Sequence, residues 1–262
     1  MSSNDPTLDE ICTFAREAGA ILRSGFGQRQ TITHKGRIDL VTEYDHRSEA
    51  YLLGQVRAHH PGHTILSEES GLQAGQKEHC WYIDPLDGTT NYAHGMPVFC
   101  VSIAYADKDA ISLGAVYDPL RDELFSAARG QGAWLNGAPI QVSDVTDLLQ
   151  SLLVTGFAYD DWVIRTNLEH FAHFSKLSQS VRRLGSAALD LCYVAAGRFD
   201  GYWELALKPW DTAAGVLIAR EAGALATAFD GTPDFLKPPG GVVAANPAIH
   251  PQLLSGLNHT DR

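Results

Sequence analysis

The pattern of apolar residues changes halfway along the chain, and this change constrains the fold more than any other feature. Between residues 64 and 142, short runs of β-branched and aromatic residues alternate with turns that contain Gly, Pro and Asn. This spacing predicts a largely antiparallel sheet. From Leu152 onward, strand-like runs alternate with helix-length segments, which is typical of an α/β layer. We therefore predict an α+β part over residues 1–143, packed on an α/β part over residues 144–262.

Local signals mark the ends of several elements. Thr7 can cap a helix that ends at the glycines near Gly25, and a second helix is predicted from near Thr42 to His59, before Pro61-Gly62. Asn136-Gly137 offers two residues that tolerate a positive φ, which predicts a tight hairpin.

The net charge limits the possible partners. The chain has 20 Lys+Arg and 31 Asp+Glu, a formal charge of −11, which argues against a nucleic-acid partner or an anionic membrane surface. No apolar stretch is long enough to span a membrane, and residues 1–9 do not resemble a signal peptide, so we expect a cytoplasmic protein. The four cysteines are far apart, which favours reduced thiols over a zinc site or disulfides.

The segment Trp81 to Tyr92 contains the most informative group of polar residues. An apolar strand is followed by Asp84-Pro85-Leu86-Asp87 and then by Gly88-Thr89-Thr90. Two carboxylates and the Leu86 carbonyl can converge as hard oxygen donors for a cation, and backbone N–H groups at a helix start attract an anion. Together these parts suit metal-assisted phosphoryl chemistry. Asp-Pro and Asp-Gly are also ordinary turn sequences, so a purely structural turn remains open at this point.

Further acidic residues allow two interpretations each. Glu68-Glu69 follows a strand-like run and is either part of the same site or a solvated turn. Asp211 opens a helix and is either a ligand or a helix cap. Asp45 and Glu49 share a helix stripe with apolar residues, at a solvated edge or in the interior.

Two longer motifs identify a family resemblance. WYIDPLDGTTNYAH at residues 81–94 and WDTAAGVLIAREAGA at residues 210–224 resemble both signatures of the inositol monophosphatase family, within the lithium-sensitive, magnesium-dependent sugar-phosphatase superfamily. Stretches around Asp45, Glu68 and residues 129–143 and 184–197 are also similar. The resemblance covers nearly the whole chain and implies a layered αβαβα sandwich.

The resemblance also implies two to three Mg²⁺ ions. Glu68, Asp84 and the Leu86 carbonyl are implied to hold the first ion. Asp84, Asp87 and Asp211 are implied to hold the second, and Lys35 and Glu69 lie in the expected vicinity of a third.

Catalytic and substrate-binding roles follow from the same resemblance. Thr89, Glu68 and Asp45 are implied to position the attacking water, and the Gly88 and Thr89 amides to bind phosphate. The implied substrate-binding residues are Glu204, Asp211, Gly185, Ser186 and Ala187.

The implied activity is hydrolysis of inositol 1-phosphate by a homodimer. Asn91 after the Gly-Thr-Thr turn fits the inositol and sugar branch of the superfamily. Fructose-1,6-bisphosphatase and histidinol-phosphate phosphatase are alternatives that share the motif. A different class, a non-catalytic or moonlighting regulatory binding protein, also stays open, because bacterial proteins that resemble this chain engage the transcription machinery.

Overall fold

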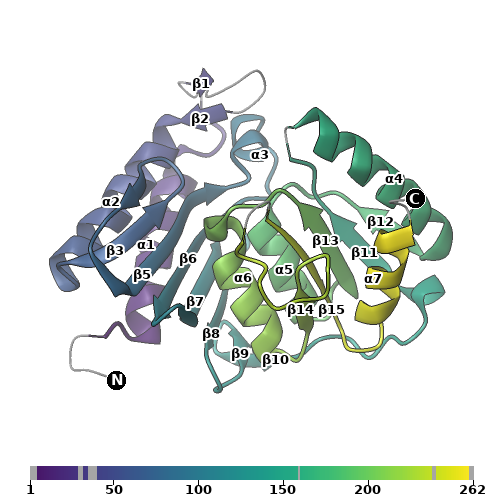
Figure 1. Cartoon of the computed structure of the whole chain (residues 1–262). Helices are drawn as coiled ribbons and strands as arrows, with labels where there is room; N and C mark the ends of the chain where they lie inside the picture. The colour runs from purple at the N-terminus through teal and green to yellow at the C-terminus, as the bar shows by residue number, and fades with distance from the viewer. Residues whose placement is uncertain (1–4, 29–31, 35–39, 159, 238–239, 260–262) are drawn as a thin grey trace.

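Five layers stack in the order helix, sheet, helix, sheet, helix in the computed structural model (Figure 1). The structure describes residues 5–28, 32–34, 40–158, 160–237 and 240–259. Helices α1 and α2 form one outer layer, α5 and α6 lie between the two sheets, and α4 and α7 form the other outer layer. This arrangement confirms the predicted α+β class and the αβαβα sandwich.

The helices of the described residues are α1 (Leu8–Gly25), α2 (Glu43–His59), α3 (Thr89–Ala93), α4 (Asp161–Leu177), α5 (Ala187–Ala195), α6 (Pro209–Glu221) and α7 (His250–His259), with a 3₁₀ turn at Leu148–Gln150. Thr7 caps α1 as predicted, and α2 begins next to Thr42 as predicted, with Thr42 as its N-cap; the two hydroxyls accept hydrogen bonds from Glu10 N and Tyr44 N. Pro209 is the first residue of α6, a position where its missing N–H costs nothing.

The larger sheet has eight strands in the order β10-β9-β8-β7-β6-β5-β3-β4. These are β3 (His63–Ser67), β4 (Gly71–Gln73), β5 (Gln76–Asp87), β6 (Cys100–Asp107), β7 (Ala110–Asp118), β8 (Glu123–Ala128), β9 (Ala133–Leu135) and β10 (Ala138–Ile140). All its neighbouring strands are antiparallel except β3 and β5. Asn136 and Gly137 both have positive φ, at 51° and 79°, between β9 and β10, which confirms the hairpin.

The smaller sheet has five strands in the order β12-β11-β13-β15-β14. They are β11 (Leu152–Thr155), β12 (Ser180–Arg182), β13 (Gly201–Leu205), β14 (Leu225–Thr227) and β15 (Gly241–Ala245), and β11 is parallel to both of its neighbours. A separate pair, β1 (Ile32–His34) and β2 (Leu40–Thr42), precedes α2.

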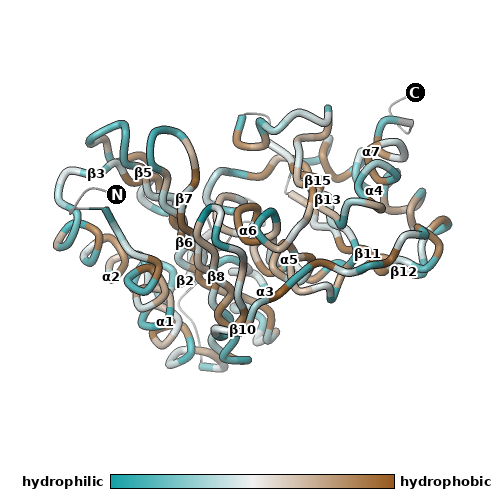
Figure 2. Tube along the Cα trace, turned by 90° about the horizontal axis from the view of Figure 1, so that it is seen from below, coloured by the Kyte–Doolittle hydropathy of each residue, from teal (hydrophilic) through white to brown (hydrophobic). Residues whose placement is uncertain are grey.

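Apolar side chains fill the spaces between the layers, and Figure 2 shows hydrophobic residues concentrated along the inner strands and on α5 and α6. One buried cluster joins α1 and α2 to the larger sheet, and another joins α4 and α7 to the smaller sheet. The central cluster takes residues from both sheets, including Phe125 and Val242. Each large buried side chain contributes about 1.5–3 kcal/mol. The two parts of the chain therefore share one extensive core.

Helix α6 lies close to its neighbours because small residues face them. A Cβ on Gly215 would lie 2.8 Å from the Leu191 side chain of α5, and a Cβ on Gly114 of β7 would lie 3.2 Å from the Ala214 backbone. Within the described ranges, no helix combines the length and apolar character that a bilayer crossing requires.

Candidate active site

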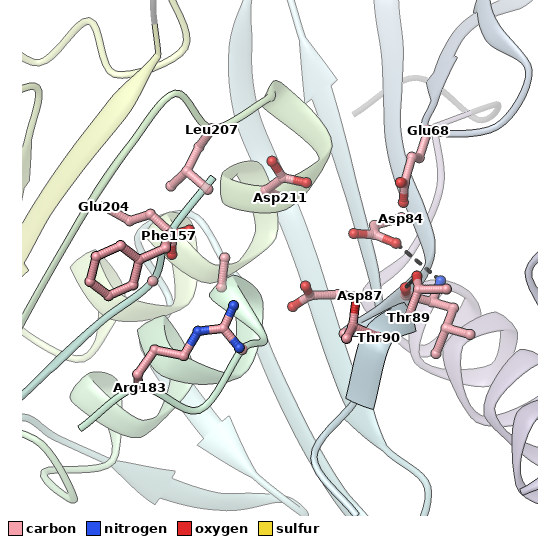
Figure 3. Close-up of a pocket in the computed structure, with 15 residues that line it drawn as sticks. Glu68, Asp84, Asp87, Thr89, Thr90, Phe157, Arg183, Glu204, Leu207 and Asp211 are labelled. Atoms are coloured by element: carbon pink, nitrogen blue, oxygen red, sulfur yellow. Dashed lines mark hydrogen bonds between the residues drawn. The ribbon is translucent and has the colours of Figure 1, made fainter. Parts of the chain in front are cut away.

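A cavity opens where strand ends from both sheets meet the first turns of α3, α5 and α6 (Figure 3). It is lined by Glu68, Asp84, Leu86, Asp87, Gly88, Thr89, Thr90, Gly156, Phe157, Arg183, Gly185, Ala187, Glu204, Leu207 and Asp211. The segments are far apart in sequence, and the layered fold brings them together. Side chains held on strand ends and helix starts are positioned rigidly, as a catalytic site requires.

The end of β5 places Asp84 and Asp87 at the cavity. The register with β6 shifts between these two residues, where Pro85 has no N–H to donate to the ladder. Ser48 of α2 donates a hydrogen bond of 2.8 Å to the Pro85 carbonyl, and Leu86 N donates one of 3.0 Å to Asp84 Oδ1. The prediction ended this strand at Ile83, whereas β5 continues to Asp87 through the bulge.

The acids at the cavity repel one another. Asp84 is 2% exposed, and its pKa lies well above the ordinary value because of burial and the nearby negative charges of Glu68, Asp87 and Asp211. Burial is also the main cause of the raised pKa of Asp87 and of Asp211. Within the described ranges, no ion pair joins Asp84, Asp87 or Asp211 to a cationic side chain.

Gly88 turns the chain from β5 into α3. Its φ of 92° lies in the left-handed region, and a Cβ there would lie 2.9 Å from the Val98 carbonyl oxygen. Thr89 is the first residue of α3, so its N–H has no partner within the helix. Asn91 then donates hydrogen bonds of 2.8 Å to the carbonyls of both Val98 and Leu184, which ties α3 to the strand that precedes Gly185.

Asp45 is connected to the cavity through Thr89. The Thr89 hydroxyl lies 3.1 Å from Asp45 Oδ1 and 2.9 Å from the Leu86 carbonyl oxygen, and its one proton can go to either acceptor. Asp45 Oδ2 accepts hydrogen bonds from the N–H and hydroxyl of Thr42. Burial raises the pKa of Asp45 to about 6, and the charge of Glu69 adds to this shift.

The interpretation of Asp45 and Glu49 as a solvated helix edge is wrong. Asp45 is fully buried and Glu49 is 7% exposed. Glu49 Oε1 accepts hydrogen bonds from the Ser67 hydroxyl and from Ser70 N, so it fixes the chain on both sides of Glu68.

Asp87 connects the two parts of the chain. Its Oδ2 accepts a hydrogen bond of 2.6 Å from the Ser186 hydroxyl and one of 2.8 Å from Ala188 N. The start of α5 is therefore held directly against the end of β5.

Asp211 is in the first turn of α6 but is not its N-cap. The N-cap is Lys208, and Asp211 Oδ2 accepts a hydrogen bond of 2.7 Å from Lys208 N. Within the described residues no hydrogen bond ends on Asp211 Oδ1, and Figure 3 shows this carboxylate facing Asp84 and Asp87. The interpretation of Asp211 as the helix cap is therefore wrong about its position. One of its carboxylate oxygens binds the backbone at the start of the helix, and the other faces the cavity.

Glu204 forms the far wall of the cavity. It is 8% exposed, and its Oε2 accepts a hydrogen bond of 2.7 Å from the Tyr202 hydroxyl. Burial, with a smaller effect from the charge of Asp87, raises its pKa to about 7. Gly156 makes room for this carboxylate, because a Cβ at Gly156 would collide with Glu204 Oε2.

Most of the site residues predicted from the sequence meet here. Ten of them are on the cavity wall: Glu68, Asp84, Leu86, Asp87, Gly88, Thr89, Gly185, Ala187, Glu204 and Asp211. Asp45 and Ser186 stand behind the wall as hydrogen-bond partners of Thr89 and Asp87. Glu69 is not on the wall but is near Asp45. Lys35 lies outside the described residues.

Sequence reasoning missed several residues at the site. Phe157, Arg183 and Leu207 line the cavity, and no motif in the chain singles them out. Asp190, one turn into α5, is fully buried, and neither of its carboxylate oxygens has a hydrogen-bond partner in the described part of the chain. Burial and the nearby Glu204 and Asp87 hold its pKa well above the ordinary value. In the sequence, its position within an apolar helical segment did not indicate a site residue.

The donor set suits a hard divalent cation. Carboxylates and a carbonyl oxygen are the ligands that Mg²⁺ prefers, and the mutual repulsion at Asp84 is relieved by positive charge. Within the ranges described, no three of these side chains are already closed around one point. They surround an open cavity, which leaves room for water and substrate beside a cation.

Fold and site together define the class as a layered αβαβα protein with a buried acidic cleft beside helix N-termini. A model of the inositol monophosphatase family matches residues 3–261. The chain belongs to the inositol monophosphatase family. Members of this family are phosphatases and generally depend on Mg²⁺.

Relatives in this family carry two kinds of name. The chain is 51% identical over 256 residues to an inositol-1-monophosphatase of Synechocystis sp., covering 96% of this chain and 88% of that one. It is 41% identical over 256 residues to the Nus factor SuhB of Escherichia coli, covering 96% of both chains. Among solved structures, an inositol monophosphatase from Anabaena (Nostoc) sp. is 47% identical, with a TM-score of 0.86 and coverage of 96% of this chain and 95% of that one.

Proposed function

We propose that the protein is a Mg²⁺-dependent phosphate monoester hydrolase that converts inositol 1-phosphate and water to inositol and phosphate. The observation that carries this proposal is the cavity in which four acids from three chain segments face the start of α3. The Synechocystis relative named inositol-1-monophosphatase supports the choice of substrate. Residues 1–143 contribute most of the proposed cation ligands, and residues 144–262 contribute Asp211 and the polyol side of the cavity.

The proposed cation ligands are Glu68, Asp84, the Leu86 carbonyl, Asp87 and Asp211. When bound, Mg²⁺ supplies positive charge that offsets the phosphate and lowers the pKa of water. Asp84 would contribute to both of two ions in this proposal, which is supported by Glu68 on one side of it and Asp87 and Asp211 on the other (Figure 3). Glu69 and Lys35 belong to the proposed vicinity of a third ion.

Thr89 and Asp45 form a proton path for the attacking water. If the Thr89 hydroxyl donates to Asp45 Oδ1, its lone pairs face the cavity and can accept a proton from water. Asp45 is buried with a pKa raised to about 6, which suits a base that accepts a proton near neutral pH. Glu68, which also lines the cavity, is the second acid proposed to orient the same water.

The remaining residues bind the substrate. The Gly88 and Thr89 amides are placed for the non-bridging phosphate oxygens. Glu204 and Asp211, with the backbone of Gly185 and Ala187, face the space for the polyol hydroxyls. The Ser186 hydroxyl is already donated to Asp87, so Ser186 acts on the substrate through Asp87.

An assay of phosphate release tests the proposal. Purified protein is given inositol 1-phosphate, fructose 1,6-bisphosphate, histidinol phosphate or 3′-phosphoadenosine 5′-phosphate, each with Mg²⁺ and with a chelator. We expect the highest kcat/KM on inositol 1-phosphate and no release with the chelator. A preference for fructose 1,6-bisphosphate or histidinol phosphate would replace the substrate but keep the reaction class.

The route of hydrolysis is tested separately. We propose that water attacks phosphorus directly, without a covalent enzyme intermediate. A single turnover in ¹⁸O-water should place the label in the released phosphate. Label in the carboxylates of the enzyme would overturn the direct route.

A second candidate function rests on the relatives named Nus factor SuhB, which are 41–44% identical over nearly the whole chain. In this candidate the chain acts as a regulatory binding protein, alone or beside hydrolysis. A folded protein that releases no phosphate from any of the four substrates would favour it. We also propose a homodimer, which light scattering on the purified protein measures directly.

A further inference from the structure

A second cavity, of about 600 Å³, lies at the opposite end of α6 from Asp211. It is enclosed by the turn between β6 and β7, the end of β8, the last turns of α6 and the loop before β15. Its volume is in the range of small-molecule sites, which is about 300–1,000 Å³. None of the residues proposed for hydrolysis lines it.

One wall of this cavity is apolar and rigid. It is formed by the buried side chains of Ile111, Val216, Leu217 and Phe235, which are at most 8% exposed. Val216 and Leu217 belong to α6, whose buried face is part of the central core. Such a wall is already in place before any ligand arrives, so binding costs little reorganisation.

Two guanidinium groups face the same space. Arg129 donates from Nη2 to the Ile111 carbonyl oxygen, and Arg220 donates from Nη2 to the Ala226 carbonyl oxygen at 2.6 Å. The Arg220 guanidinium also lies 4.9 Å from the centre of the Phe235 ring. Each group is thus anchored by one nitrogen, while an arginine carries five N–H donors in total.

Acids are also present, because Asp109, Glu221 and Asp234 line the same cavity. Within the described residues, neither Arg129 nor Arg220 forms an ion pair, whereas Arg16, Arg121 and Arg198 each do. Glu221 is close by, but its two oxygens accept hydrogen bonds from Gly130 N and Gly132 N at 2.8 and 2.9 Å. Asp234 is paired with Lys237. Burial and the neighbouring charge of Arg129 lower the pKa of Arg220.

We propose that this cavity binds a small organic anion, with an apolar and preferably aromatic body against the wall and a carboxylate, phosphate or sulfonate group between Arg129 and Arg220. An anion there relieves the repulsion between the two guanidiniums and uses their remaining donors, since planar guanidinium groups bind such oxyanions well. The site is independent of the Mg²⁺-dependent reaction proposed above.

Calorimetric titration with two matched probes tests the charge requirement. Naphthalene-2-sulfonate carries the anion, and naphthalene-2-sulfonamide has the same ring system without the charge. We expect one sulfonate per chain, and binding of the sulfonamide weaker by at least about tenfold, because hydrogen bonds to a charged group are worth about 1.5–3 kcal/mol.

Variants locate the binding. R129M and R220M, alone and combined, should weaken the sulfonate by at least about tenfold and leave the sulfonamide unchanged. Arg182→Met is the matched control, because Arg182 is another exposed arginine whose Nη1 donates to a backbone carbonyl, that of Val181. The control should bind both probes like the wild type. Phosphatase activity without probe should be equal in all variants, which separates failure of this site from failure of the proposed function.

Two results would overturn the proposal: equal affinity for both probes in the wild type, or the same loss in R182M as in the double variant. If the methionine variants do not fold, R220K answers the question. It keeps the charge but loses the planar donor fork, so we expect an intermediate affinity for the sulfonate, and an unchanged affinity would contradict the proposed contact.

Discussion

The buried acids of this protein fall into two groups that differ in their partners. At the turn after β7, Asp118 is 1% exposed and accepts hydrogen bonds from Leu120 N, Arg121 N and the Arg121 guanidinium. At the junction of the two parts, Asp200 is 7% exposed and accepts hydrogen bonds from the Ser143 hydroxyl and Leu152 N. The chain itself satisfies both carboxylates, so both hold the structure together.

Asp84 in the cleft is equally buried but is surrounded by other acids. Asp84 has Glu68, Asp87 and Asp211 as its charged neighbours, and each raises its pKa. Burial alone therefore does not distinguish a structural acid from a functional one in this protein. The difference lies in whether the chain supplies the compensating charge or leaves it to a bound ion.

The largest expected effect comes from Asp84→Asn. Asparagine keeps the shape and can still accept from Leu86 N through Oδ1, but it removes the charge that two Mg²⁺ ions are proposed to share. We expect kcat to fall by at least about a thousandfold, equivalent to about 4 kcal/mol of transition-state stabilisation. Steady-state phosphate release at saturating Mg²⁺ measures this.

The same variant should be more stable than the wild type without metal. A carboxyl group whose pKa is raised by folding opposes folding at pH values above its unfolded pKa, and the neutral amide of asparagine avoids that cost. We expect about 1 kcal/mol or more of added unfolding free energy at neutral pH in a chelator. A less stable Asp84→Asn protein would show that Asp84 belongs with the structural acids.

Asp118→Asn should give the opposite result. The amide group that replaces Oδ2 cannot accept from Arg121, so the guanidinium loses its acidic partner and, within the described residues, keeps only the Pro97 carbonyl oxygen outside residue 118. We expect a loss of about 1–3 kcal/mol in unfolding free energy and an unchanged kcat per folded molecule. Urea denaturation and activity on the same samples measure both, and a fall in kcat comparable to that of Asp84→Asn would end the distinction between the two groups.

Glu204 is intermediate, with one donor from the chain and an open side toward the cavity. Gly156→Ala tests it without changing any acid, because the new Cβ would collide with the Glu204 carboxylate. We expect KM for inositol 1-phosphate to rise about tenfold with a smaller change in kcat, since polyol binding is lost in ground and transition states alike.

Gly54→Ala is the matched control for this substitution. Gly54 lies inside α2, and apart from the adjoining helix backbone no atom of the described residues is within 4 Å of its added Cβ. It should leave KM unchanged and stabilise the protein by about 0.5–1 kcal/mol through helix propensity. An unchanged KM in Gly156→Ala would remove Glu204 from the polyol site.

Local sequence signals predicted the parts of the fold that depend on neighbouring residues. The cap at Thr7, the helix start near Thr42 and the hairpin at Asn136-Gly137 are determined within a few residues, and the structure has all three. The end of β5 was misplaced because Asp-Pro and Asp-Gly favour a turn locally, while pairing with β6 extends the strand to Asp87. Tertiary pairing decided that boundary.

Site residues that belong to sequence motifs could be predicted, and site residues that only the packing of elements brings to the cavity could not. The segments at residues 81–94 and 210–224 contain most of the cavity acids, so family resemblance found them. Phe157 and Arg183 reach the cavity because β11 and β12 are neighbours in a parallel sheet, a pairing that no local signal specifies. Asp190 was overlooked because the burial of an acid within an apolar helix depends on the elements that pack around the helix, which the local sequence does not specify.

The smallest expected effect concerns stability and a cluster of histidines, His60, His63 and His79. His60 and His63 flank the turn after α2 and are only 5% and 7% exposed, and the His63 ring stacks on His79 with centroids 4.5 Å apart. Burial and then the nearby His79 and His60 lower the pKa of His63 to about 4, against a smaller opposing effect of Asp5. Unlike the cleft acids, His63 avoids repulsion by staying neutral, and Trp81 Nε1 donates to His63 Nδ1 at 3.1 Å.

This difference predicts how acid affects stability. Between about pH 6.5 and 4 the unfolded chain binds a proton at residue 63 that the folded chain does not, so stability falls as the pH falls through this range. We expect wild type to lose about 1 kcal/mol more than His63→Gln between about pH 7.5 and 5.5, measured by urea denaturation in a chelator. His94→Gln, at an exposed position, should behave like the wild type. Equal losses of unfolding free energy in wild type and His63→Gln would mean that protonation of His63 does not destabilise the fold. The contrast between this neutral histidine and the cleft acids, which are proposed to bind a cation, would then fail.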